Sequence, residues 1–266
     1  MNTRFSFGEN WKRFLGVLNE ERIKEAENSL LEMIGMNELK GRSFLDIGCG
    51  SGLFSLVAKR LGARVYSFDY DPQSVACTAE LKRRYFPDDV NWKIEGGSAL
   101  DIDYLKSLGK FDIVYSWGVL HHTGDMWKAL ENVPPLVERC GKLFIFIYND
   151  QGLTSKIWRM IKRTYNKLPK PLRFFVLYPA FLRLWGPTMV KDTLCRKPFY
   201  TWKNYKDIRG MSAWHDVVDW VGGYPFEVAK PSEVICFYQK KGFVLAKSKG
   251  VGSGLGCNEF LFEKPK

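Results

Sequence analysis

The run DIGCGSG at residues 46–52 constrains the fold of this chain more than any other feature. It follows a short apolar segment at 43–47, which predicts a buried strand, and it precedes residues 53–61, which predict a helix. Glycines at alternate positions let the backbone turn sharply and approach a ligand closely, because a Cβ atom there would be in the way. A strand, a glycine-rich turn and a helix in this order predict a ligand-binding loop on a parallel sheet.

The alternation of strands and helices continues on both sides of this loop. Further strands are expected at 64–68, 91–94, 111–116 and 142–148, and further helices at 72–85 and 126–137. Near the end of the chain a helix is expected at 232–241, and strands at 243–249 and 259–263 flank a glycine-rich turn, which predicts an antiparallel hairpin. The pattern predicts an α/β fold with a doubly wound, Rossmann-like, seven-stranded sheet that is mostly parallel.

Charge and aromatic content divide the chain unevenly. Residues 151–213 contain 14 Lys or Arg and 2 Asp or Glu, a net of +12, whereas the whole chain carries +11, so the remainder is near −1. The predicted organisation is an N-terminal helical flap at 1–40, a core at 41–151, a basic, aromatic lid insertion at 152–213, and the C-terminal part of the core at 214–266. Residues 10–35 predict an amphipathic helix or helix pair in the flap.

Cysteine spacing and the N-terminal residues bear on the cellular compartment. The six cysteines are far apart and form no C-x-x-C pair, which favours reduced structural thiols, and no spacing indicates a metal site. The first residues contain no apolar export signal, so a cytoplasmic location is expected.

Two acidic residues flank the glycine-rich turn and indicate what it binds. Asp46 precedes the glycines, where its carboxylate can attract an ammonium group and would repel a diphosphate; dinucleotide sites prefer G-x-G-x-x-G instead. Asp69 ends the next strand, 19 residues after Gly50, where an acid can accept hydrogen bonds from two ribose hydroxyls. Tyr70 is then placed to lie against an adenine ring.

These elements together resemble the class I S-adenosylmethionine (SAM)-dependent methyltransferases, over residues 41–150 and 230–266. The resemblance is closest to the small-molecule branch that includes the ubiquinone-type O-methyltransferases and the sugar and natural-product methyltransferases. It implies SAM as cofactor, S-adenosylhomocysteine as product, and cofactor contacts from the loop positions Gly48, Cys49, Gly50 and Gly52.

The same resemblance assigns further cofactor contacts. The segment YSWGVLHH at 115–122 is similar to the family's segment after the fourth strand, which implies that Ser116 and Trp117 lie beside the methionine part. The segment at 96–101 implies adenine contacts from Ser98 and Ala99, although many relatives have an acid in place of Ser98, so Asp101 is an alternative. The N-terminal flap over the cofactor is expected to include Phe5, Phe7 and Trp11.

Candidate catalytic residues follow the fourth and fifth strands and the basic segment. A general base is needed only when the acceptor is protonated, as a hydroxyl is. His121 and His122 are candidates, although they are expected to point about 100° apart and to serve different roles, one of them structural. His215 is a candidate because neighbouring carboxylates would raise its basicity, with helix capping as the alternative. Tyr148 and Asp150 are placed to orient an acceptor.

The basic insertion leaves several interpretations open. Lys156, Arg159, Arg163 and Lys167 form one stripe of a predicted amphipathic helix. Residues 171–190 are largely apolar but contain two arginines and three prolines, which favours an interfacial segment or a lid over a spanning helix. The segment would serve as a plain helical cap, bind an anionic or lipid-linked small molecule, contact a membrane peripherally, or bind nucleic acid.

Three functions remain in contention from the sequence. The leading hypothesis is O-methylation of a small or lipid-linked metabolite such as a sugar or phenol. The second is an RNA (tRNA) methyltransferase that uses the basic insertion to bind its substrate. The third is a SAM-binding partner protein without catalytic activity.

Overall fold

The computed structural model describes residues 4–205, 213–252 and 254–266 of the chain. Its centre is a seven-stranded sheet in the order β3-β2-β1-β4-β5-β7-β6. Strands β1 to β5 run parallel, β7 runs antiparallel to β5, and β6 runs antiparallel to β7. The expected fold class, including the C-terminal antiparallel hairpin, is confirmed. The strands are β1 (Ser43–Ile47), β2 (Arg64–Asp69), β3 (Trp92–Gly96), β4 (Phe111–Trp117), β5 (Val137–Tyr148), β6 (Val244–Lys249) and β7 (Cys257–Glu263).

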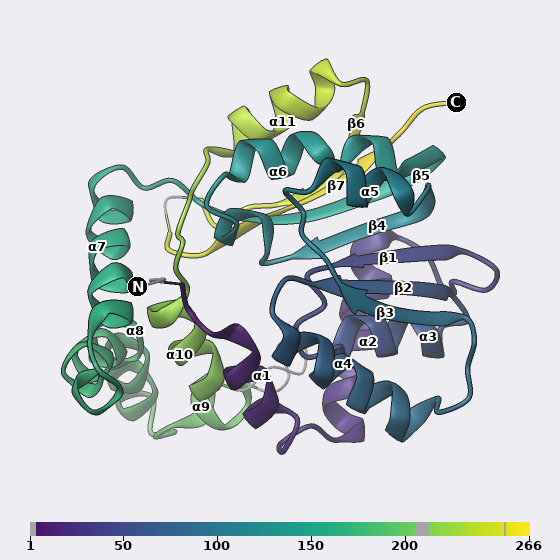
Figure 1. Ribbon diagram of the computed structural model, residues 1–266. Coiled ribbons are helices and arrows are strands. Elements are labelled where there is room, and N and C mark those ends of the chain that lie inside the picture. The colour runs from purple at the N-terminus through teal and green to yellow at the C-terminus, as the bar shows by residue number, and fades with distance from the viewer. Residues whose placement is uncertain (1–3, 206–212, 253) are drawn as a thin grey trace.

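Helices cover both faces of the sheet (Figure 1). One face packs against α2 (Glu20–Ile34), α3 (Leu53–Arg60) and α4 (Pro72–Tyr85). The other packs against α5 (Ile102–Ser107), α6 (Met126–Asn132) and α11 (Pro231–Lys240). The strand residues therefore alternate between two apolar layers, which explains why β1 and β4 are almost entirely buried.

The sequence interpretation was wrong on two points between β3 and β5. The helix expected at 126–137 ends at Asn132, because the prolines at 134 and 135 lack the backbone N–H that would continue it, and β5 already begins at Val137. The helix α5 was missed, since it is only six residues long and is recognisable mainly by its cap, Asp101, whose carboxylate accepts from the Tyr104 N–H at 3.0 Å.

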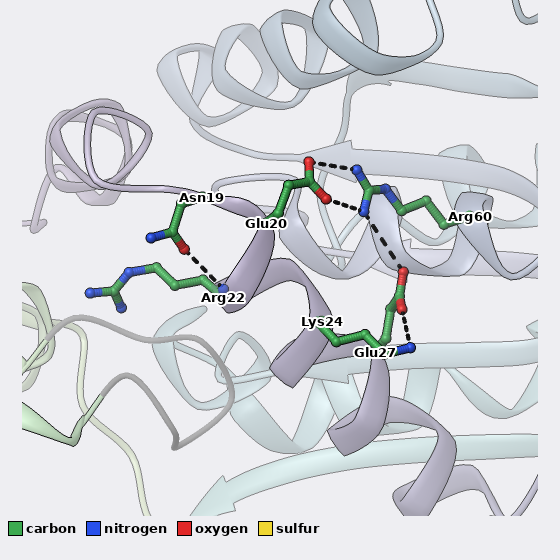
Figure 2. Close-up of polar contacts among 6 residues, drawn as sticks. All are labelled: Asn19, Glu20, Arg22, Lys24, Glu27 and Arg60. Atoms are coloured by element: carbon green, nitrogen blue, oxygen red, sulfur yellow. Dashed lines mark hydrogen bonds and ion pairs between the residues drawn. The ribbon is translucent and has the colours of Figure 1, made fainter.

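The N-terminal residues form a helix pair, which was one of the two expected forms. The first helix is α1 (Phe7–Phe14), and the second is α2, which Asn19 caps by accepting from the Arg22 N–H at 3.0 Å. Figure 2 shows how α2 is tied to α3: both Nη atoms of Arg60 donate to the Glu20 carboxylate, at 2.7 and 2.9 Å. Glu27 adds a longer ion pair with Arg60 at 3.9 Å.

A separate helical layer lies beside the sheet and contains α7 (Leu153–Lys167), α8 (Phe174–Leu194), the short α9 (Tyr200–Lys203) and α10 (Ala213–Gly222) (Figure 1). A third apolar cluster joins this layer to the N-terminal segment and to the end of β5, through residues such as Phe5, Tyr148, Trp158 and Val221. Helix α10 packs with α1, α7 and α8, so it belongs to the helical layer although all but its first residue follow the predicted end of the insertion. The predicted insertion includes residues 206–212, which lie outside the described part of the chain.

Candidate functional site

A cavity of about 420 Å³ opens at the carboxyl ends of β1, β2 and β4. This edge is where ligands bind in open parallel sheets. Its size is in the range of small-molecule sites, and its lining is more apolar than polar. The glycine loop and the segments after β2, β3 and β4 form its floor and sides, while α1 and the residues before it form its roof.

The roof is held in place by polar contacts that run from the N-terminal segment to three other elements. The Phe5 N–H donates to the Tyr224 carbonyl at 2.9 Å, and the Gly8 N–H donates to Asp71 Oδ2 at 2.9 Å. The Arg4 guanidinium lies 4.5 Å from the centre of the Tyr70 ring and donates to the His122 carbonyl at 2.9 Å. Arg4 therefore bridges two sides of the cavity, a role that the sequence did not suggest.

The glycine loop has the conformation that its sequence predicts. Gly48 has a φ of +75°, and a Cβ atom there would lie 2.4 Å from the Val119 side chain. Gly50 has a φ of +53°, and a Cβ atom there would lie 2.8 Å from Trp11 Nε1. Both positions therefore need glycine, for backbone conformation and for space. The Trp11 indole lies against the loop and lines the cavity.

Asp69 lies at the end of β2 with each carboxylate oxygen held by one backbone N–H. Oδ2 accepts from Gly50 at 3.0 Å and Oδ1 accepts from Asp71 at 2.8 Å. Burial raises the pKa of Asp69 to about 6, against the lowering effect of these two hydrogen bonds. The carboxylate therefore has a fixed orientation and retains acceptor capacity, since each oxygen has a second lone pair.

Asp46 is almost completely buried below the glycine loop. Its Oδ2 accepts from the Ser55 hydroxyl at 2.5 Å, and the same hydroxyl lies 2.7 Å from Ser67 Oγ. Burial raises the pKa of Asp46 to about 7; the Ser55 hydrogen bond opposes this rise and the negative charge of Asp69 adds to it. A nearby positive charge would relieve the cost of ionising this buried carboxylate.

The cavity is acidic, although the protein as a whole is basic. Four aspartates line it, Asp46, Asp69, Asp71 and Asp219, whereas Arg4 is the cationic side chain among the described lining residues. The chain as a whole carries +11. A cavity with this charge favours a cationic ligand and disfavours a polyanionic one such as a dinucleotide.

Aromatic side chains and the two histidines form the end of the cavity away from the glycine loop. The His121 and His122 rings lie 4.0 and 5.4 Å from the Tyr148 ring, and Phe7 lies 4.9 Å from His122. Both histidines are on a 3₁₀ turn, Leu120–His122, and both line the cavity. The two rings lie 4.4 Å apart, centre to centre. The expectation that they serve different roles, one of them structural, stays a prediction.

The two histidines are neutral near pH 7. Burial and the positive charge of Lys162 lower the pKa of His122 to about 3, and its Nδ1 lies 2.5 Å from the Pro225 carbonyl. Burial also lowers the pKa of His121, and the charges of His122 and Lys162 add to this effect. Neither ring nitrogen of His121 has a hydrogen-bond partner of normal geometry in the described part of the protein. Such a ring presents donor and acceptor capacity to the cavity.

Asp219 and Lys162 lie at the same end, near enough for the charge of each to affect the pKa of the other, and the sequence did not suggest either. Asp219, on α10, lines the cavity, and its Oδ1 is shielded from solvent without a hydrogen-bond partner among the described residues. Lys162, on α7, is fully buried; its Nζ donates to the Trp220 carbonyl and lies 5.3 Å from the centre of the Tyr148 ring. Burial raises the pKa of Asp219 to about 7 and lowers that of Lys162 to about 7, while each charge opposes the shift of the other.

Most of the cofactor residues expected from the sequence come together in this cavity. The lining includes Phe5, Phe7, Trp11, Asp46, Gly48, Cys49, Gly50, Asp69, Tyr70, Ser98, Ala99 and Trp117. Gly52 and Ser116 do not line it: Gly52 starts α3 with a φ of +82°, and the Ser116 hydroxyl donates to the Ile47 carbonyl at 3.3 Å. Asp101 caps α5 and is also outside the lining, while the Ser98 hydroxyl accepts from the Leu100 N–H at 3.2 Å.

Among the expected catalytic residues, Asp150 and His215 lie outside the cavity. Asp150 lines a separate shallow depression beside Gly252, and its Oδ1 accepts from the Gly152 N–H at 2.9 Å. His215, on α10, packs 6.3 Å from the Phe14 ring, and its carbonyl accepts from the Asn10 side chain at 3.1 Å. The expectation that neighbouring carboxylates raise its basicity is wrong, because burial and the charges of Arg13 and Arg22 lower its pKa.

Comparison with known proteins supports the interpretation of this cavity. A sequence profile described as "Methyltransferase domain" matches residues 45–143, the span from the glycine loop to β5. The ubiquinone biosynthesis O-methyltransferase of Coxiella burnetii is 27% identical over 177 residues, which is 65% of this chain and 70% of that protein. Over residues 45–143 the chain contains a SAM-dependent methyltransferase domain.

Solved structures of methyltransferases share the fold over almost the whole chain. Magnesium protoporphyrin IX methyltransferase from Synechocystis PCC 6803, with bound S-adenosylhomocysteine, aligns with a TM-score of 0.56 and 14% identity, over 96% of this chain and 93% of that one. The N-methyltransferase NodS from Bradyrhizobium japonicum, in complex with the same product, aligns with a TM-score of 0.51 and 14% identity, over 93% and 89%.

The residues of the methyltransferase cavity fit SAM chemically. SAM carries a sulfonium, an ammonium and two ribose hydroxyls, and the cavity offers buried carboxylates and no cluster of cationic groups. The described residues contain no group of three or more His, Cys, Asp or Glu side chains placed to hold a metal ion. None of the described residues of 152–205 lines the cavity; the helical layer reaches it through Asp219.

Proposed function

We propose that this methyltransferase transfers a methyl group from SAM to a hydroxyl of a small or lipid-linked metabolite such as a sugar or phenol. The observation that carries the proposal is the cavity itself, in which the carboxylate end at the glycine loop continues into an aromatic end with Asp219, His121 and His122. The Coxiella relative is an O-methyltransferase of ubiquinone biosynthesis, which supports oxygen as the acceptor atom.

The carboxylate end would hold the cofactor. The Asp69 carboxylate, fixed by Gly50 and Asp71, accepts hydrogen bonds from the two ribose hydroxyls. The Asp46 carboxylate attracts the ammonium group of the methionine part, and this positive charge favours the ionised form of Asp46. The Trp11 indole and the glycine loop enclose the ligand between α1 and β1.

Adenine would occupy the side of the cavity formed by Tyr70 and the segment after β3. Ser98 and Ala99 offer backbone and side-chain groups there, and Asp101 contributes only through the cap of α5. One face of the Tyr70 ring is covered by the Arg4 guanidinium, which leaves the other face for stacking.

The aromatic end would hold the acceptor. Bound SAM supplies an electrophilic methyl group, so the protein must position the acceptor oxygen, exclude water and accept a proton. Phe7, Trp117 and Tyr148 provide apolar walls, and burial keeps the Tyr148 phenol protonated by raising its pKa. The neutral His121 ring offers a hydrogen bond to orient the acceptor.

Asp219 is the residue we assign as the general base. A base is most effective when its pKa is close to the working pH, and a histidine with a pKa near 3 accepts a proton only weakly near neutrality. The Asp219 Oδ1 atom lines the cavity without a hydrogen-bond partner, and Lys162 stabilises its ionised form. The hydroxyl proton of the acceptor passes to this carboxylate as the oxygen takes the methyl group.

The charge of the cavity argues against a nucleic-acid acceptor at this site. Four aspartates would repel phosphates near the transferred methyl group, and the basic residues of the helical layer do not line the cavity. The experiment is incubation of the purified protein with methyl-labelled SAM and separate small-molecule, lipid and RNA extracts. Label in the small-molecule or lipid extract supports the proposal, and label only in RNA refutes it. Tight SAM binding without transfer to any extract would instead favour a non-catalytic SAM-binding protein.

A further inference from the structure

Exposed apolar side chains gather on the helical layer. Among the described residues, 13 of the 18 large hydrophobic side chains that are exposed lie between residues 153 and 214, and only 5 lie elsewhere. Large exposed apolar surfaces on a folded protein usually mark a contact with another molecule. We use "outer face" for the exposed side chains of α7 and α8. The two helices lie at the edge of the molecule beside the sheet (Figure 1).

On α7 the exposed apolar residues form one stripe bordered by positive charges. Leu153, Ile157 and Met160 are 76, 53 and 63% exposed, and their spacing of four and three places them on one side of the helix. Lys156 and Arg163 are exposed along the border of this stripe, each three residues from one of its members. The opposite side of α7 is buried through Trp158, Lys162 and Tyr165.

On α8 a second apolar stripe is exposed. Phe175, Tyr178 and Leu182 are 64, 55 and 62% exposed at spacings of three and four, and Val190 continues the stripe two turns later. Arg183 and Lys191 are exposed beside it. The helix is apolar on its buried side as well, which is unusual for a helix at the surface of a soluble protein.

The charge on the outer face is almost entirely positive. Residues 151–213 carry 14 Lys or Arg and 2 Asp or Glu. One of the two acids, Asp192, is buried, and its carboxylate accepts from the Thr201 N–H and hydroxyl at 2.8 Å each. Within the described part of the chain, Lys156, Arg163 and Arg183 form no ion pair. These charges are therefore available to an external anionic partner.

Positive charge and exposed apolar side chains together favour a bilayer surface over nucleic acid as the partner of the outer face. Nucleic acid would use the cations and some aromatic rings, but it offers nothing to the exposed aliphatic side chains of Leu153, Ile157, Met160 and Leu182. A bilayer surface with anionic headgroups takes up both, because apolar side chains enter the acyl boundary while Lys and Arg pair with headgroups. No helix of the described residues is long and apolar enough to cross a bilayer, and α8 contains Pro179 and Pro187.

We propose that the outer face of α7 and α8 docks this protein on the surface of a bilayer that contains anionic lipid. The residues that enter the acyl boundary are Leu153, Ile157 and Met160 on α7 and Phe175 and Leu182 on α8. Docking does not depend on the proposed acceptor, since none of these residues lines the cavity.

The test is sedimentation of the full chain with vesicles of phosphatidylcholine alone and of phosphatidylcholine mixed with phosphatidylglycerol. We expect binding to the mixed vesicles that weakens as salt is raised, and little binding to phosphatidylcholine alone. The charge-reversal variant Lys156→Glu/Arg163→Glu should bind the mixed vesicles at least about thirty-fold more weakly, because each surface cation contributes roughly a fivefold factor and reversal also adds repulsion. The variant Phe175→Ser/Leu182→Ser should bind about tenfold more weakly at any salt concentration.

Matched controls use exposed residues on other surfaces. Lys93→Glu/Lys106→Glu reverses two charges on β3 and α5, and Val90→Ser/Val244→Ser removes two exposed apolar side chains, so both should bind vesicles like the unaltered protein. Unchanged circular dichroism and unchanged SAM affinity would show that every variant is folded. SAM affinity also separates this proposal from the proposed function, because a protein without transferase activity could still dock.

Three outcomes would overturn the proposal. The first is no difference between the two vesicle compositions. The second is a stable dimer in sedimentation that Phe175→Ser/Leu182→Ser dissociates, with no vesicle binding, which would assign the outer face to a second copy of the chain. The third is binding of single-stranded RNA that the charge variant abolishes and the apolar variant leaves unchanged, again with no vesicle binding.

Discussion

Substitution of Asp69 tests the placement of the cofactor most directly. In Asp69→Ala both ribose hydroxyls lose their acceptor, whereas the glycine loop and the Asp46 carboxylate remain. Each lost hydrogen bond to the carboxylate is expected to cost about 1–2 kcal/mol, so the total is about 2–4 kcal/mol. The dissociation constant for SAM should then rise by a factor of roughly 30 to 700. The effect is measurable by titration calorimetry without knowledge of the acceptor.

The replacement Asp69→Asn refines the prediction, because an amide keeps one acceptor oxygen. Its NH₂ group would face the backbone N–H of either Gly50 or Asp71, and that donor would lose its acceptor. We expect about half of the loss seen with alanine. Asp125→Asn is the matched control: Asp125 is also a helix cap, accepting from the Lys128 N–H at 3.3 Å, but it lies outside the cavity.

The pH dependence supplies a second measurement on the same variants. The pKa of Asp69 is raised to about 6, so protonation removes the ribose acceptor as the pH falls below 6. SAM affinity of the unaltered protein should drop by about tenfold per pH unit in that range from this group alone, and less steeply in Asp69→Ala. Unchanged affinity in a folded Asp69→Ala protein would mean that the ribose lies elsewhere, and the assignment of the carboxylate end would fail.

Three further perturbations follow from the same cavity. Gly50→Ala should lower SAM affinity by at least about tenfold, because residue 50 has a positive φ and its new Cβ would lie 2.8 Å from Trp11 Nε1 and displace the indole. Tryptophan fluorescence would report the displacement, and an unchanged spectrum and affinity would contradict the prediction. SAM binding near pH 7 should release protons, because the bound ammonium lowers the raised pKa of Asp46; calorimetry in buffers of different ionisation enthalpy would detect this, and Asp46→Asn should abolish most of the release. With the acceptor identified, Asp219→Asn should lower kcat by about 100-fold or more while SAM affinity is retained. Lys162→Met should move the acidic limb of the pH–rate profile to higher pH, because Lys162 lowers the pKa of Asp219. A profile that does not move would exclude Asp219 as the base.

The sequence alone was sufficient to predict the fold, and most of the residues that it nominated for the cofactor line one cavity. The loop at 46–52 and Asp69 lie next to the strands β1 and β2, so local pattern and the rules of parallel sheets place them together. The errors in the predicted helices arose in short segments. The paired prolines ended α6 early, and α5 is too short for its periodicity to be visible.

The acceptor end was decided by tertiary structure. Asp219 and Lys162 are 57 positions apart in the chain and carry no shared motif, so only the packing of α7 against α10 makes them a pair. The same packing lowers the pKa of both histidines, because it buries their rings and brings the positive charge of Lys162 near them. His215 is flanked by carboxylates in the sequence, but burial and the charges of Arg13 and Arg22 lower its pKa.

Local sequence therefore determined the glycine loop and the position of Asp69 beside it, because both lie within one βαβ unit. Tertiary structure determined the protonation of the distant groups and the exposure of the apolar stripes on α7 and α8. A periodic apolar pattern marks both sides of α8, and only the arrangement of its neighbours shows which side is buried and which faces outward.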